Sequence, residues 1–185
     1  MVKLIIIGDS GVGKTTLQNQ WVLRRETEVK CNIGYDFLSK DILIKDIPAT
    51  IQIWDTAGQE RFESLGVSYF RGVDCCLLVY DVTKEISFDH LEKWKDLCQQ
   101  QETRFPLVVV GNKIDLQKEC KFEEKVEKWC ESNGFSHFET SAKSKIGVDE
   151  MFFKALQEVQ ISLDDQSDPI SLNQDTSSSY FSYCC

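Results

Sequence analysis

Short apolar runs alternate with polar stretches along most of the chain. The runs cover residues 2–7, 42–44, 50–54, 75–82, 107–110 and 135–138. Several are continuously apolar, which is typical of strands covered on both faces. Between them, apolar residues recur at helical spacing, as at Phe88, Leu91, Trp94 and Leu97, and again over residues 148–159. Strands that alternate with helices predict an α/β fold: a doubly wound, mostly parallel sheet with helices on both faces.

The pattern changes after Leu163. The stretch over residues 164–182 is rich in Ser, Asp and Gln and holds only scattered apolar side chains, which favours a flexible tail. We therefore predict one folded domain over residues 1–163 and a flexible tail over residues 164–185. One domain also fits the length of 185 residues.

The formal net charge of −9 at pH 7 argues against a nucleic-acid partner, because clustered Lys and Arg bind phosphate backbones. It also argues against adhesion to anionic lipid by charge alone. The chain shows neither an apolar run of transmembrane length nor a signal-peptide layout, so we expect a soluble, intracellular protein. In that compartment six of the eight cysteines are expected to be reduced structural thiols: Cys31, Cys75, Cys76, Cys98, Cys120 and Cys130.

A glycine-rich turn follows the first apolar run. Residues 8–15, Gly-Asp-Ser-Gly-Val-Gly-Lys-Thr, match the P-loop pattern GxxxxGK[ST], in which backbone N–H groups point at phosphate oxygens. Lys14 would add a charge to the β and γ phosphates, and the Thr15 hydroxyl can ligate Mg²⁺. The nucleotide-binding candidates here are Ser10, Gly11, Val12, Gly13, Lys14, Thr15 and Thr16. The motif alone indicates only a nucleoside triphosphate, because ATPases and nucleotide kinases share it.

Two later motifs point to guanine. Asn112, Lys113 and Asp115 follow an apolar run, and the Asp115 carboxylate can accept hydrogen bonds from guanine N1–H and the 2-amino group. Adenine offers neither donor, so an unpaired carboxylate would penalise it. The remaining candidates follow the next strand: Ser141, Ala142 and Lys143. The Ala142 amide could meet guanine O6, and the Lys113 and Lys143 stems are long enough to flank the base.

A third motif suits a sensor of the γ-phosphate. Asp55 ends the run at residues 50–54 and can hold Mg²⁺ through water. The Gly58 amide can contact the γ-phosphate only while that group is present, and Gln59 can orient the attacking water as the catalytic residue. Positioning and charge stabilisation dominate phosphoryl transfer, so these parts predict GTP hydrolysis with a loop that responds to its completion.

These motifs, in this order, resemble the Ras-like small GTPases over the chain up to about Leu163. Residues 33–37 and 54–62 resemble the switch segments of Rab proteins, and residues 69–72 and 78–83 fit as well. Residues 64–67 and 73–76 resemble the late-endosomal and lysosomal Rab branch. The resemblance implies the small GTPase P-loop fold. It also implies a GTPase that cycles between GDP and GTP states with Mg²⁺, regulating vesicle traffic from endosome to lysosome. Intrinsic hydrolysis should be slow, because no arginine finger is recognisable in cis.

The resemblance also implies partners and a location. Effectors would read the GTP state at a surface that includes Ile33, Phe37, Trp54 and Tyr69. The alternative for the three aromatics is that they are partly buried packing residues. An exchange factor, a GTPase-activating protein, a Rab escort protein and a dissociation inhibitor would complete the cycle. We expect the cytoplasmic face of late endosomes, lysosomes or the vacuole, with a cytosolic pool.

Switch I departs from the family pattern at Asn32, where the family has a Thr that ligates Mg²⁺. An Asn carbonyl is an acceptable oxygen ligand, but it is longer and differently shaped, and magnesium tolerates little distortion. We therefore expect slower hydrolysis. The alternative function is a nucleotide-binding scaffold that does not cycle, for which Asn32 is the evidence. A P-loop ATPase or kinase is a further alternative, which Asp115 disfavours.

Cys184 and Cys185 end the sequence after the polar tail. This ending is not a C-a-a-X box, and it resembles the Rab ending that receives two geranylgeranyl groups. One lipid chain binds membranes marginally, whereas two anchor stably, so both cysteines are predicted lipidation sites.

Overall fold

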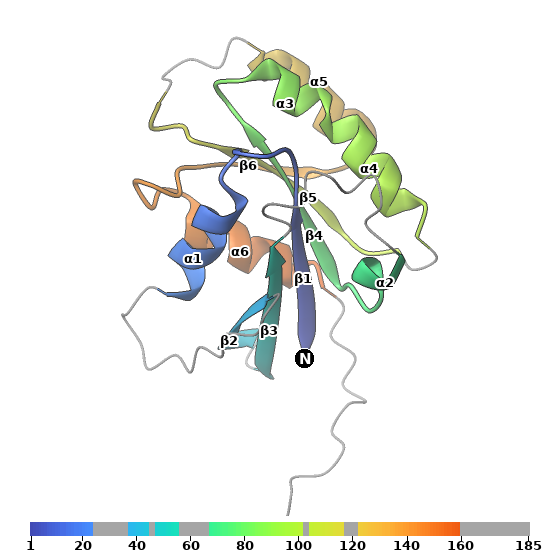
Figure 1. The fold of residues 1–185 in the computed structure, drawn as a ribbon, viewed down its shortest axis with the longest axis vertical. Coiled ribbons are helices and arrows are strands. Elements are labelled where there is room, and N and C mark those ends of the chain that lie inside the picture. Colours follow the sequence, from blue (N-terminus) through green and yellow to red (C-terminus); the bar gives the residue numbers. More distant parts are fainter. Residues whose placement is uncertain (24–36, 45–46, 56–66, 102–103, 117–121, 160–185) are drawn as a thin grey trace, which may run out of the picture.

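The computed structural model describes residues 1–23, 37–44, 47–55, 67–101, 104–116 and 122–159 (Figure 1). Its centre is a six-stranded sheet of order β2-β3-β1-β4-β5-β6. The strands are β1 Val2–Ile7, β2 Phe37–Ile44, β3 Ile47–Asp55, β4 Cys75–Asp81, β5 Leu107–Asn112 and β6 Ser136–Thr140. Only the β2–β3 pair is antiparallel within this sheet, and the other pairs are parallel. The mostly parallel α/β fold is thus confirmed.

Helices cover both faces of the sheet (Figure 1). One face is packed by α1 (Lys14–Val22) and α6 (Val148–Gln157), and the other by α3 (Glu85–Asp89), α4 (Leu91–Gln99) and α5 (Glu123–Asn133). A short α2 (Val67–Phe70) precedes β4. Among the described residues, no helix is both long enough and apolar enough to cross a membrane.

The apolar run at β4 is continuous because its side chains enter two separate cores. Cys75, Leu77 and Val79 pack with α1 and α6, while Cys76 and Leu78 pack with the helices of the opposite face. All seven residues of β4 are buried. Burial raises the pKa of the Cys75 thiol to about 12. The predicted structural thiols are confirmed for Cys75, Cys76, Cys98 and Cys130, which are free and buried. Cys31 and Cys120 lie outside the described residues.

Two elements differ in extent from the sequence expectation. The β2 strand begins at Phe37, well before the apolar run at residues 42–44. The apolar run does not show this beginning, because Ser39, Lys40 and Asp41 interrupt the hydrophobic pattern of this outer strand. The repeat at Phe88, Leu91, Trp94 and Leu97 belongs to two helices, α3 and α4, which meet at His90. The predicted boundary between domain and tail at residues 163–164 lies outside the described residues.

Candidate functional site

The phosphate loop follows β1 at the edge where the parallel strands end. Gly8 has φ +145°, and a Cβ there would lie 2.1 Å from the Val79 carbonyl oxygen, so this close approach of backbones requires glycine. Lys14 begins α1 and is buried. Its Nζ donates hydrogen bonds to the carbonyl oxygens of Gly8 and Asp9, both at 2.8 Å. The loop therefore curls around the lysine ammonium at the positive end of a helix.

Asn112, at the end of β5, joins three loops. Its Nδ2 donates to the Val12 carbonyl oxygen at 2.9 Å. Its Oδ1 accepts from the Ala142 amide at 3.1 Å and from Thr140 Oγ1 at 3.3 Å. A Cβ on Gly13 would lie 2.4 Å from Asn112 Nδ2, so glycine is needed for this contact as well. The Ala142 amide, which was expected to face guanine O6, thus donates to Asn112 in this structure.

Lys113 forms a second link to the phosphate loop. Its Nζ donates to the Gly11 carbonyl oxygen at 2.6 Å and to Asp81 Oδ2 at 2.7 Å. Asp81 ends β4 and is buried, and Thr83 donates to its other carboxylate oxygen. Burial by itself raises the pKa of Asp81, but the hydrogen bonds from Lys113 and Thr83 outweigh it, so this pKa lies below its ordinary value. Sequence analysis missed the supporting role of Asp81, although a carboxylate at the end of an apolar strand was visible there.

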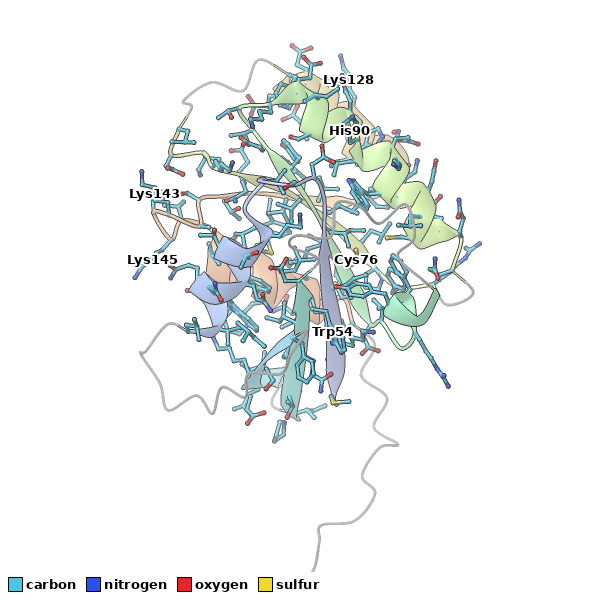
Figure 2. All side chains as sticks on the ribbon, in the orientation of Figure 1. Trp54, Cys76, His90, Lys128, Lys143 and Lys145 are labelled. Carbon is cyan, nitrogen blue, oxygen red and sulfur yellow. The ribbon has the colours of Figure 1, made fainter. Side chains whose placement is uncertain are left out.

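Asp115 and Ser141 lie together between the β5 and β6 loops. Ser141 Oγ donates to Asp115 Oδ1 at 2.6 Å and accepts from the Ser144 amide at 2.9 Å. Ser141 is fully buried, whereas Asp115 is exposed and can face a ligand. Lys143 is exposed and lies with Lys145 in the loop after β6, at the edge of the molecule (Figure 2).

Two candidate metal residues are in contact. Thr15 Oγ1, at the start of α1, donates a hydrogen bond to Asp55 Oδ2, at the end of β3. The structure thus brings these two oxygen donors together across 40 positions of sequence. Several candidates lie outside the described residues: Asn32, Ile33, Gly58, Gln59, Cys184 and Cys185.

The three described aromatics of the expected effector surface pack against one another. The ring centroids of Phe37 and Trp54 are 5.0 Å apart, and those of Trp54 and Tyr69 are 6.1 Å apart. Lys3 Nζ lies 4.5 Å from the Trp54 ring centroid. All three aromatics are partly buried, so the cluster is both packed and partly accessible.

Comparison with known proteins decides the family. The Ras family model matches residues 3–161, most of the chain. The chain belongs to the Ras family. Rab7 of Drosophila melanogaster is 46% identical over 178 residues, which cover 92% of this chain and 86% of that protein. Rab-7a of Dictyostelium discoideum is 49% identical over 160 residues, covering 82% and 79%. The Ypt/Rab-type GTPase avaA of Emericella nidulans is 44% identical, covering 95% and 93%.

Within the Ras family this is a Rab protein of the Rab7 branch, as residues 64–67 and 73–76 predicted. It is a Rab GTPase that binds GTP and GDP, cycles between these two states and acts in vesicle traffic with regulators and effectors. The alternative of a scaffold that does not cycle finds no support in these relatives.

Proposed function

We propose that this Rab GTPase holds GTP or GDP with Mg²⁺ across the loops that follow β1, β3, β5 and β6, and that it hydrolyses GTP slowly. The observation that carries the proposal is the pair of links from residues 112 and 113 to the phosphate loop. Asn112 binds Val12, and Lys113 binds Gly11. Because these links join the phosphate loop to the guanine motif, both ends of one nucleotide can be held at a fixed separation.

The phosphate end would be bound by backbone amides and one ammonium group. The amides belong to Ser10, Gly11, Val12, Gly13, Lys14, Thr15 and Thr16, which span the loop and the first turn of α1. Lys14 Nζ already lies inside the loop, bound to two of its carbonyl oxygens. A bound phosphate would provide stronger, charged acceptors for the same ammonium group.

The base end would be selected by Asp115. Ser141 orients one carboxylate oxygen of Asp115 through a short hydrogen bond, which favours one rotamer. Asp115 would then accept from guanine N1–H and the 2-amino group, with the Ala142 amide beside O6. The Lys113 and Lys143 stems would flank the base. A carboxylate fixed for these donors disfavours adenine.

The contact of Thr15 with Asp55 fits a magnesium site, because Mg²⁺ prefers hard oxygen ligands and both groups supply them. When bound, Mg²⁺ would supply positive charge that stabilises the phosphate oxygens. Thr15 would bind it directly, Asp55 through water, and Asn32 through its side-chain carbonyl. Gln59 would orient the attacking water, and the Gly58 amide would sense the γ-phosphate. We infer slow hydrolysis because no arginine finger is recognisable in the sequence.

We further propose a role in endosome-to-lysosome traffic, with the protein on the cytoplasmic face of late endosomes, lysosomes or the vacuole and a pool in the cytosol. Two of its named relatives are Rab7 proteins, which supports that branch of traffic. Effectors would bind the surface of Ile33, Phe37, Trp54 and Tyr69. The other partners would be an exchange factor, a GTPase-activating protein, a Rab escort protein and a dissociation inhibitor. Two lipids on Cys184 and Cys185, at the end of a tail over residues 164–185, would anchor the domain of residues 1–163.

Single-turnover hydrolysis tests the proposal. Protein loaded with GTP and Mg²⁺ is followed to GDP, with Asn32→Thr beside it and ATP as a competitor during loading. We expect slow conversion in the wild type, a several-fold faster rate in Asn32→Thr because Thr fits the magnesium geometry better, and no displacement by ATP.

The outcomes separate the parts of the proposal. Equal rates in both proteins would show that Asn32 does not limit hydrolysis. Tight GTP binding without hydrolysis, even with a Rab-type activating protein, would contradict the catalytic role of Gln59 and favour the scaffold. Displacement by ATP would contradict the role of Asp115.

A further inference from the structure

The carboxylate of Asp9, within the phosphate loop, is bound by two side chains from the α3–α4 region. His90 Nδ1 lies 2.6 Å from Asp9 Oδ2, and Trp94 Nε1 donates to Asp9 Oδ1 at 3.1 Å. Each carboxylate oxygen therefore has its own partner. The partners lie 81 and 85 positions further along the chain, so the contact is purely tertiary. Figure 2 shows His90 at the junction of α3 and α4.

Asp9 connects this contact to the proposed phosphate site. Its backbone carbonyl accepts the hydrogen bond from Lys14 Nζ, while its side chain binds His90 and Trp94. An uncompensated carboxylate in a loop that binds phosphates would repel the ligand. Hydrogen-bond donors on both carboxylate oxygens would stabilise this charge, fix the orientation of the side chain and hold the loop backbone as well.

The α3–α4 region is firmly attached to the sheet. Leu91 is fully buried and Cys98 nearly so, which fixes the rotation of α4 about its axis. Ser87 of α3 accepts from the Asp81 amide at 3.0 Å and so fastens α3 to the end of β4. His90 and Trp94 are four residues apart and therefore face the same side of the helical segment. A rigid segment presents both donors to one carboxylate.

We propose that His90 and Trp94 are positioning residues for the phosphate loop. By binding both oxygens of the Asp9 carboxylate they fix its orientation and keep the loop amides and Lys14 arranged for nucleotide phosphates, which slows nucleotide release. This inference rests on the proposed phosphate-binding role of residues 8–15. Trp94 carries the larger share, because its indole is partly buried and donates to a charged acceptor, whereas His90 is half-exposed and solvent screens its pairing.

Release of a fluorescent GDP derivative tests the inference. The full-length protein is loaded in Mg²⁺ and chased with excess GDP. Trp94→Phe keeps the ring and removes the Nε1 donor, and we expect release about tenfold faster. His90→Ala removes the second partner, and we expect release about threefold faster. Asp96→Ala, at an exposed position of the same helix, should release GDP at the wild-type rate.

A double-mutant cycle distinguishes positioning from a general loss of stability. In the Asp9→Ala background neither Trp94→Phe nor His90→Ala should accelerate release further, because the shared partner is gone. Equal acceleration in both backgrounds would overturn the inference, since the effect would not pass through Asp9. Wild-type release rates in both single variants would also overturn the inference. If these variants still bind GDP tightly, the proposed function stays intact. A wild-type protein that binds no GDP would overturn the proposed function itself.

Discussion

At the scale of single residues, neighbouring positions of the guanine motif at residues 112–115 have different roles. Asn112 is buried and bonded to Val12, Thr140 and Ala142, so it is part of the framework. Asp115, three positions later, is exposed, and its carboxylate accepts a hydrogen bond from Ser141. The same tetrapeptide therefore holds one structural residue and one residue available to a ligand.

Alanine at these two positions should separate the two roles. Asn112→Ala leaves the Val12 carbonyl and the Ala142 amide without their partner, so we expect a loss of unfolding free energy of about 1–3 kcal/mol together with weaker GDP binding. Asp115→Ala removes one hydrogen bond, from the Ser141 hydroxyl, so we expect a smaller loss of unfolding free energy, of about 1 kcal/mol, together with weaker GDP binding. Urea unfolding and GDP titration measure both. Equal stability losses in the two variants would contradict this division.

At the scale of elements, Gly111 of β5 allows side chains of the strands on either side, β4 and β6, to contact each other. Gly111 of β5 pairs with Tyr80 of β4, and a Cβ at Gly111 would lie 2.7 Å from the Tyr80 hydroxyl. Because Gly111 has no side chain, the Tyr80 hydroxyl can cross β5 and reach His137 Nε2 of β6 at 3.1 Å. The two rings are stacked with centroids 6.0 Å apart. The contact connects the edge strand β6, whose following loop carries base-binding candidates, to the central strand β4.

This contact predicts a pH dependence of stability. Burial lowers the pKa of His137 below its ordinary value of 6.5, so the folded state favours the neutral ring. As pH falls below 6.5 the unfolded chain binds the proton first, and stability declines until the folded-state pKa is reached. Stability from this group is therefore complete above pH 6.5. We expect the urea unfolding free energy to fall between pH 7.5 and 5.5 through His137.

His137→Gln provides the control, because the amide keeps a partner for the Tyr80 hydroxyl and does not titrate. The difference between wild type and variant isolates His137 from the other histidine, His90. Parallel pH profiles in the two proteins would contradict the assignment.

At the scale of the whole molecule, the proposed site uses both halves of the sheet. The loops after β1 and β3 carry the phosphate and metal candidates, and those after β5 and β6 carry the base candidates. Strand β4 lies between the halves, and its last residue, Asp81, binds Lys113. The net charge of −9 gives no general attraction to anionic membranes, so we propose that membrane attachment comes from the tail.

Removal of Cys184 and Cys185 should abolish membrane attachment while leaving GDP binding unchanged. Two lipid chains give stable anchoring and an acidic body gives none, so we expect the truncated protein in the cytosolic fraction. Cell fractionation measures the distribution, and GDP titration of the purified truncated protein checks its fold. Cys184→Ser, which keeps one lipid site, should bind membranes weakly and reversibly. Membrane retention of the doubly truncated protein would contradict lipid anchoring.

The sequence by itself determined the fold class, the family and the positions of the motifs. Continuous apolar runs mark strands buried on both faces, and motifs at their ends meet at one edge because parallel strands finish on the same side. Periodicity did not show the first residues of β2, where polar residues of an outer strand mask the pattern. It correctly indicated helix around His90, but it did not show that the helix is divided there into α3 and α4.

Only the tertiary structure decided which contacts hold the site. Asn112 meets Val12 across 100 positions, and Asp9 meets His90 across 81. The partial burial of the aromatics at 37, 54 and 69 and the pairing of Asp81 with Lys113 were likewise decided there. Local spacing reports which face of an element is apolar, but it carries no information on which polar side chains from distant elements fall within hydrogen-bonding distance. That depends on strand order and helix rotation, which the packing of the whole core sets.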